Sequence, residues 1–116
     1  PQRDERMPWL GDRTTGALGE SYVVNNHALY SKWVNDLLDC QRADGAISDV
    51  APAYWRLYNH NITWPAALPM VCDMLYTQYG DLAPMAESYP AIHKWLNFIK
   101  GKSMSIGLLT YDRYGD

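Results

Sequence analysis

The sequence predicts an all-α fold built from helical hairpins. Apolar residues recur at spacings of three and four in several segments, and no segment alternates apolar and polar residues as a strand does. Short and long connections alternate between those segments, which suits antiparallel helix pairs. The chain has 116 residues, of which 47% are hydrophobic, so we expect one core and at most one domain.

The first part of the chain is predicted to be a loop followed by two helices. Residues 1–11 carry two prolines, a glycine and four charges without any helical period. Residues 12–24 are rich in small side chains, which predicts a helix that depends on close packing rather than on intrinsic propensity. The next helix is amphipathic, and we expect Asp44-Gly45 to end it. Its apolar face comprises Leu29, Tyr30, Trp33, Val34, Leu37 and Leu38.

A long connection over residues 43–64 separates the two predicted hairpins. It is aromatic and irregular, and a loop of this length in a compact domain is more often functional than idle. The third helix is expected to stop at Gly80-Asp81, and its apolar residues are Leu68, Val71, Cys72, Leu75 and Tyr79. The fourth helix should end at Gly101, after a separate short helical turn at residues 84–87. Its apolar face comprises Tyr89, Ile92, Trp95, Leu96 and Ile99.

The aromatic and sulfur-containing residues divide between core and loop. Aromatic residues on apolar helix faces are expected in the core, namely Tyr30, Trp33, Tyr89 and Trp95. Three others lie in the long loop, where sugar binding and packing both remain open: Tyr54, Trp55 and Tyr58. Cys40 and Cys72 stand among apolar neighbours, which predicts two buried free thiols.

Composition excludes several classes of function. A net charge of −3 lacks the excess of Lys and Arg that nucleic-acid binding needs, so we expect no nucleic-acid partner. No apolar stretch approaches the roughly 20 residues that span a bilayer, so no membrane partner is expected. The three histidines, His27, His60 and His93, lack the spacing of a zinc site, and we expect no metal or other cofactor. Because the chain begins at Pro1, we expect an excised segment whose compartment stays open.

The richest group of functional side chains is the run Pro1-Gln2-Arg3-Asp4-Glu5-Arg6-Met7-Pro8-Trp9-Leu10-Gly11-Asp12. It holds three carboxylates, two guanidinium groups and an indole. Aromatic faces cover the C–H face of a pyranose, while carboxylate and guanidinium groups bind its hydroxyls. A carboxylic acid with a raised pKa can protonate a glycosidic oxygen. These residue types suit a sugar site, and they suit a solvated charged loop as well.

This run resembles the signature of bacterial α-L-rhamnosidases, glycoside hydrolase family 78. Later stretches follow in the order expected for that family: Ser48-Asp49-Val50-Ala51-Pro52, then Trp64, then Gln78-Tyr79-Gly80-Asp81. The resemblance covers the whole chain. It implies that residues 1–116 are an incomplete part of an (α/α)6 six-hairpin glycosidase barrel, the catalytic domain of that family.

The resemblance also implies a role for particular residues. Glu5 matches the general acid of an inverting hydrolysis of terminal α-L-rhamnosides, and Asp4 is kept as a structural neighbour. The residues matched to the subsite for the terminal sugar are Arg3, Trp9 and Asp12, with Trp64 as a further aromatic wall and Asp49 in a loop at the barrel mouth. The expected partner is a rhamnose-containing glycoside or polysaccharide, without a cofactor.

Departures from the family pattern leave a second function open. In the family that the chain resembles, the catalytic base comes from a later hairpin, and nothing in this chain matches it. Pro8 and Pro65-Ala66 stand where many members have glycine and Gly-Asp. The alternative is a non-catalytic carbohydrate-binding or structural module with the same fold. In isolation, the chain is expected to be inactive and to self-associate through hairpin faces that lack their neighbours.

Overall fold

The computed structural model describes residues 4–59 and 62–102, and in these residues all regular secondary structure is helical. The helices are α1 (Leu10–Ser21), α2 (His27–Asp39), α3 (Ala67–Tyr79) and α4 (Ala83–Lys100). The one β-type feature among the described residues is an isolated antiparallel bridge between Trp9 and Val50. The predicted all-α class is confirmed.

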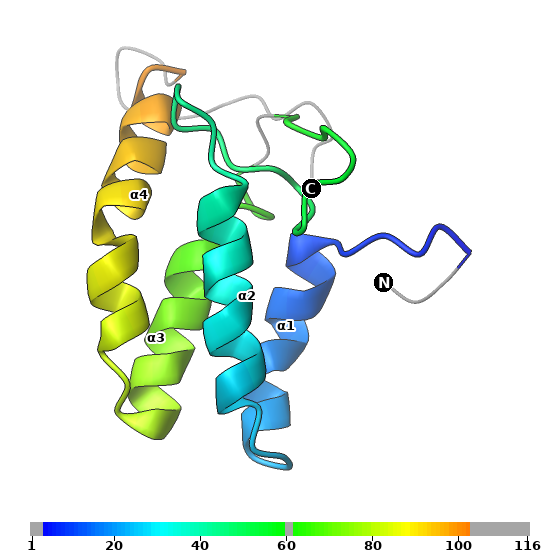
Figure 1. Cartoon of the computed structure of the whole chain (residues 1–116), viewed down its shortest axis with the longest axis vertical. Coiled ribbons are helices and arrows are strands. Elements are labelled where there is room, and N and C mark those ends of the chain that lie inside the picture. Colours follow the sequence, from blue (N-terminus) through cyan, green and yellow to red (C-terminus); the bar gives the residue numbers. More distant parts are fainter. Residues whose placement is uncertain (1–3, 60–61, 103–116) are drawn as a thin grey trace.

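The four helices form two hairpins that lie side by side (Figure 1). Short turns join α1 to α2 and α3 to α4 at one end of the bundle. The long connection over residues 40–66 lies at the opposite end, where the N-terminal segment also meets α1. Both predicted motif regions therefore occur at the same end of the molecule.

Helix α3 is the centre of the bundle, because it packs against α1, α2 and α4. Its buried side chains are Ala67, Leu68, Val71, Cys72, Met74 and Leu75. The other helices add Leu10, Tyr30, Leu37 and Trp95 to the same core. Burying one side chain of leucine size contributes about 1.5–3 kcal/mol, so this cluster supplies much of the driving force for folding.

Polar contacts fix the end of the bundle that carries the short turns. Asn26 is 4% exposed, and its side-chain amide donates to the Ala17 carbonyl oxygen at 3.3 Å. The Tyr79 hydroxyl donates to Asn26 Oδ1 at 2.7 Å, so α1, α2 and α3 meet at one asparagine. Nearby, His27 Nε2 lies 2.7 Å from Asp81 Oδ2.

Some predicted helix ends differ from those observed. Helix α2 ends at Asp39, so Asp44-Gly45 belongs to the following loop and the predicted stop was wrong. The fourth helix is continuous from Ala83, so the separate turn at residues 84–87 was also wrong. Pro84 occupies the first turn of α4, where a missing N–H costs nothing. Pro90 lies inside the helix on its exposed side, where water can bind the carbonyl that loses its partner. The predicted stop at Gly80 is confirmed, with φ of 67° at the helix end.

The aromatic core predictions hold with one exception. Tyr30 and Trp95 are buried, and Trp33 is partly buried against the core. Tyr89 is 68% exposed, so its predicted core position was wrong. Helix α4 instead buries Pro84, Ser88 and Trp95. The small hydroxyl of Ser88 fits against α3 and lies 3.5 Å from Cys72 Sγ, and this rotates Tyr89 outward.

Cys40 and Cys72 are both buried and free, as predicted. Burial raises the pKa of each thiol, which keeps both groups protonated and unreactive. Among the described residues, no helix has the length and apolar character needed to cross a membrane.

Candidate functional site

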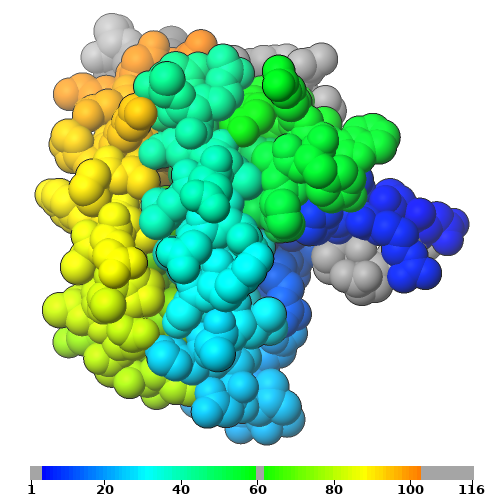
Figure 2. Space-filling view, viewed as in Figure 1, coloured from blue at the N-terminus to red at the C-terminus, as the bar shows by residue number. Residues whose placement is uncertain are grey.

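The N-terminal segment is held against the long loop by a short stretch of backbone pairing. The Leu10 amide donates to the Asp49 carbonyl oxygen at 3.0 Å, and the Ala51 amide donates to the Pro8 carbonyl oxygen at 3.2 Å. Trp9 is extended, with φ of −60° and ψ of 130°, and can therefore pair in this way. Figure 2 shows the loop near residue 50 lying directly against the N-terminal segment. Two motifs that are distant in sequence thus form one surface.

Glu5 and Asp4 lie in an exposed turn at the beginning of the described chain. Arg6 follows with φ of 52°, a left-handed conformation, and Met7 is buried at 7% exposure. Met7 therefore anchors the segment while the carboxylates face solvent. The described residues do not enclose Glu5 in apolar surroundings. Arg3, the other predicted residue of this run, lies outside the described residues.

Asp49 is an interior residue, with 2% of its surface exposed. Its amide donates to the Leu57 carbonyl oxygen at 2.8 Å, and the Asn59 side-chain amide donates to Asp49 Oδ2 at 2.6 Å. Both its backbone and its side chain therefore hold the loop in place. A contact between Asp49 and a sugar stays a prediction, and the observed contacts are structural ones.

Asp12 and Trp64, two of the predicted sugar-binding residues, line one open groove of about 530 Å³. The complete lining is Gly11, Asp12, Thr14, Thr15, Thr63, Trp64 and Met70. The Trp64 ring rests on the first turn of α1, because a Cβ added at Gly11 would lie 2.7 Å from the ring atoms. Glycine at position 11 therefore permits the contact that forms the indole wall. Trp9, the remaining predicted residue, is partly buried in the paired segment.

Gly11, Thr14 and Thr15 are groove residues that were not among the predicted site residues. The Thr14 hydroxyl donates to the Leu10 carbonyl oxygen at 2.6 Å, and the Thr15 hydroxyl lies 3.1 Å from the Asp12 carbonyl oxygen. The available signal was the run of small residues around Asp12, which equally predicts a closely packed helix.

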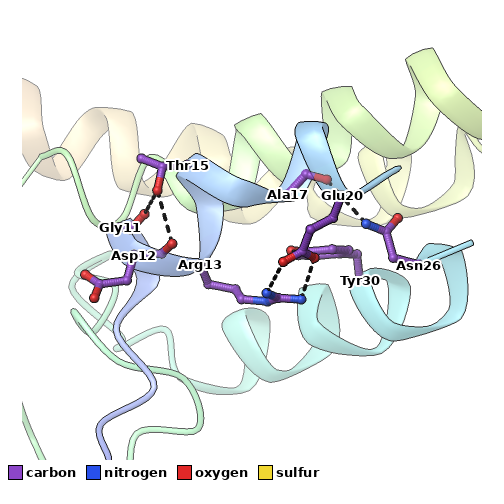
Figure 3. Close-up of polar contacts among 8 residues, drawn as sticks. All are labelled: Gly11, Asp12, Arg13, Thr15, Ala17, Glu20, Asn26 and Tyr30. Carbon is purple, nitrogen blue, oxygen red and sulfur yellow. Dashed lines mark hydrogen bonds and ion pairs between the residues drawn. The ribbon is translucent and has the colours of Figure 1, made fainter. Parts of the chain in front are cut away.

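An ion pair fixes α1 just beyond the groove (Figure 3). Arg13 Nη2 donates to Glu20 Oε2 at 2.7 Å, and the Tyr30 hydroxyl donates to the same carboxylate at 3.1 Å. The Arg13 guanidinium also lies over the Tyr30 ring, 5.0 Å from its centroid. Asp12 points away from this pair, toward the loop end of the bundle. The network therefore attaches α1 to α2.

We expect Glu20→Gln to destabilise the chain at neutral pH and to matter less in acid. Burial alone would raise the pKa of Glu20, but hydrogen bonds from Arg13 and Tyr30 outweigh it and lower the pKa below the ordinary 4.5. A depressed pKa in the folded state contributes stability above the unfolded pKa, and that stability is lost as pH falls through the folded value. The difference in urea midpoint between wild type and variant should therefore shrink below about pH 4.5. A difference that stays constant from pH 7 to pH 3 would contradict this.

The described residues contain no group of three or more His, Cys, Asp or Glu side chains arranged to hold a metal ion. The side chains that line the groove include a carboxylate, three hydroxyls and an aromatic ring. Together they offer hydrogen-bond acceptors, proton donors and apolar walls, which is the inventory of a sugar site.

A family model described as the bacterial alpha-L-rhamnosidase 6 hairpin glycosidase domain matches residues 1–116, the whole chain. The chain belongs to this family. The resemblance to α-L-rhamnosidases and the six-hairpin all-α fold class are therefore confirmed.

Curated relatives and solved structures of α-L-rhamnosidases agree with this assignment. The chain is 39% identical over 116 residues to an α-L-rhamnosidase of Streptomyces avermitilis, and 29% identical over 98 residues to one of Alteromonas sp.. The first match covers 100% of this chain and 11% of the relative, and the second covers 84% of this chain and 11% of the relative. The chain therefore spans only about a tenth of the length of these relatives.

Two solved rhamnosidase structures have the same arrangement of helices. The structure from Dictyoglumus thermophilum has a TM-score of 0.88 at 34% identity, covering 100% of this chain and 13% of that one. The Streptomyces avermitilis enzyme complexed with L-rhamnose has a TM-score of 0.90 at 38% identity, covering 98% of this chain and 11% of that one.

Proposed function

We propose that residues 1–116 form the acid-bearing part of the catalytic domain of an inverting α-L-rhamnosidase. Glu5 is the general acid, and Asp12 and Trp64 bind the terminal rhamnose. The catalytic base comes from outside this chain, so the chain alone does not hydrolyse glycosides. The observation that carries the proposal is the groove in which Asp12 lies beside an indole wall resting on Gly11.

The chemistry of the groove suits rhamnose. This sugar is a 6-deoxyhexose with vicinal hydroxyls on the ring and a methyl group in place of the hydroxymethyl. The Asp12 carboxylate can accept hydrogen bonds from hydroxyls, while Trp64 and Met70 offer apolar surface to the C–H face and the methyl group. Arg3 and Trp9 are assigned to the same sugar from their place in the motif.

The proposed reaction needs two carboxyl groups with separate tasks. Glu5 gives its proton to the glycosidic oxygen as the bond to the anomeric carbon breaks. A carboxylate about 6.5–9.5 Å away takes a proton from water, which attacks the opposite face of the ring. Glu5 is exposed in the described chain, so the apolar walls that keep a carboxylic acid protonated also have to come from the rest of the enzyme.

Hydrolysis with inversion is the test of this function. The whole enzyme that contains this chain should convert a terminal α-L-rhamnoside into β-L-rhamnose as the first product, seen by time-resolved proton NMR before mutarotation. First formation of the α-anomer would indicate a covalent intermediate and would contradict the proposed mechanism. Binding of L-rhamnose without any turnover would favour the alternative, a non-catalytic carbohydrate-binding module.

The expected self-association of the isolated chain stays a prediction. It is supported by large apolar side chains that are more than half exposed, among them Tyr22, Val23, Val24, Leu29 and Leu96.

A further inference from the structure

Tyr54 and Trp55 form an exposed aromatic pair that neither the core nor the rhamnose groove uses. Each side chain is 60% exposed, although both are large and apolar. Their ring centroids are 6.4 Å apart and the ring planes meet at 86°, so one ring presents its edge to the other. Exposed aromatic residues that are neighbours in space are a frequent feature of ligand-binding surfaces.

The loop that carries the pair is fixed at both ends. On one side, the Trp33 indole donates to the Ala51 carbonyl oxygen at 3.2 Å. On the other side, the Leu57 carbonyl oxygen accepts hydrogen bonds from the Asp49 amide at 2.8 Å and from the Ser48 hydroxyl at 3.2 Å. The aromatic pair therefore stands on a constrained loop, which we call the platform. Ligand binding to it costs little loop entropy.

The platform touches the segment that carries the proposed acid. The Tyr54 hydroxyl lies 3.3 Å from the Arg6 carbonyl oxygen and 3.3 Å from Met7 Sδ. Arg6 directly follows Glu5, so the pair adjoins the acid on the side of the long loop. The same loop region lies against the N-terminal segment in the space-filling view (Figure 2).

The geometry points to Tyr54 and Trp55 as the subsite for the sugar on the leaving-group side of the scissile bond. This inference rests on the proposed function, because it takes Glu5 as the group that protonates the bridging oxygen. The atoms bonded to that oxygen belong to the terminal rhamnose on one side and to the leaving sugar on the other. Asp12 and Trp64 are proposed to bind the terminal rhamnose. An aromatic ring beside Glu5 can pack against the C–H face of the leaving sugar. The pair carries no charge, so the expected occupant is a neutral pyranose of a glycoside or polysaccharide.

Substrates with and without a ring on the leaving side test the inference in the whole enzyme. Trp55→Ala should lower kcat/KM on a rhamnosyl-glucose disaccharide about tenfold, mainly through KM, because a stacking contact is lost. It should leave kcat/KM on methyl α-L-rhamnoside and inhibition by free L-rhamnose unchanged. Trp55→Phe keeps an aromatic face and should restore most of the loss. The control is Tyr89→Ala, which removes a similarly exposed aromatic residue from α4 and should change kcat/KM on neither substrate.

Three outcomes would overturn the subsite. The first is an equal fall of kcat/KM on both substrates. The second is a lower thermal midpoint with an unchanged ratio between substrates, which would mean that these rings pack against another part of the enzyme. The third is equal affinity of the wild type and Trp55→Ala for the disaccharide, measured by calorimetry. This measurement also works if the wild-type enzyme hydrolyses nothing, a result in which the proposed function fails but the subsite can still be tested.

Discussion

Glu5→Gln in the whole enzyme is expected to lower kcat on alkyl and sugar rhamnosides by about 100- to 10,000-fold. The carboxamide has nearly the shape of the carboxylic acid but cannot donate the proton that a departing alkoxide needs. On aryl rhamnosides with acidic leaving groups, the loss should be much smaller, because such groups depart without protonation. Steady-state kinetics on the two substrate types measure the difference directly.

The adjacent carboxylate supplies a matched control. Asp4 lies in the same exposed turn as Glu5, so Asp4→Asn makes the same change of charge one residue away. It should leave the ratio of activities on the two substrate types unchanged. If Glu5→Gln lowers kcat equally on both types of substrate, or if Asp4→Asn gives the selective defect instead, Glu5 is not the general acid.

Gly45→Ala is expected to destabilise the fold by about 2–4 kcal/mol. Gly45 has φ of +100°, a conformation that side-chain-bearing residues rarely adopt. A Cβ at this position would lie 2.6 Å from the Lys94 carbonyl oxygen and 3.1 Å from Phe98 Cβ, so the loop would have to leave α4. The Gln41 side chain donates to the carbonyl oxygens of both Gly45 and Ala91, and these hydrogen bonds would be strained as well. Urea unfolding followed by circular dichroism measures the loss.

Gly80→Ala separates backbone strain from steric contact. Gly80 also has a positive φ, +67°, but a Cβ there would meet no atom within 4 Å. Its replacement should therefore cost only about 1 kcal/mol. Equal losses for Gly45→Ala and Gly80→Ala would show that the close approach of the loop to α4 contributes nothing.

The helices were predictable from the sequence because apolar spacing reports local structure directly. Leu68, Val71 and Leu75 define the buried face of α3 without any knowledge of its neighbours. The inward face of α4 was harder to predict, because a small polar residue, Ser88, occupies a position for which the pattern favours a large apolar one. Side-chain size at a helix contact depends on the partner helix, and one helix in isolation does not contain that information.

The candidate sugar-binding residues were predicted in a different way. The assignment of Asp12 and Trp64 to one sugar site came from the family resemblance and stays a prediction, and the structure places both residues along one groove. The contact between Trp64 and Gly11 joins distant segments, and no local pattern announces it. The same holds for the bridge between Trp9 and Val50. The role of Glu5 as proton donor stays a prediction.

The hydrogen bonds that flank residues 51–57 also bear on how members of this family can diversify. The Ala51 amide donates to the Pro8 carbonyl oxygen and the Asp49 amide donates to the Leu57 carbonyl oxygen. The residues between Ala51 and Leu57 therefore form a loop whose two ends are held in place. Doubling the length of such a loop costs only about 0.6 kcal/mol of closure entropy. Residues can be exchanged or inserted there while the bonded ends, and the N-terminal segment attached to them, stay in place. Natural variation at positions other than Tyr54, whose hydroxyl contacts the Arg6 carbonyl oxygen, can thus reshape what the loop presents while the segment that carries Glu5 stays in place.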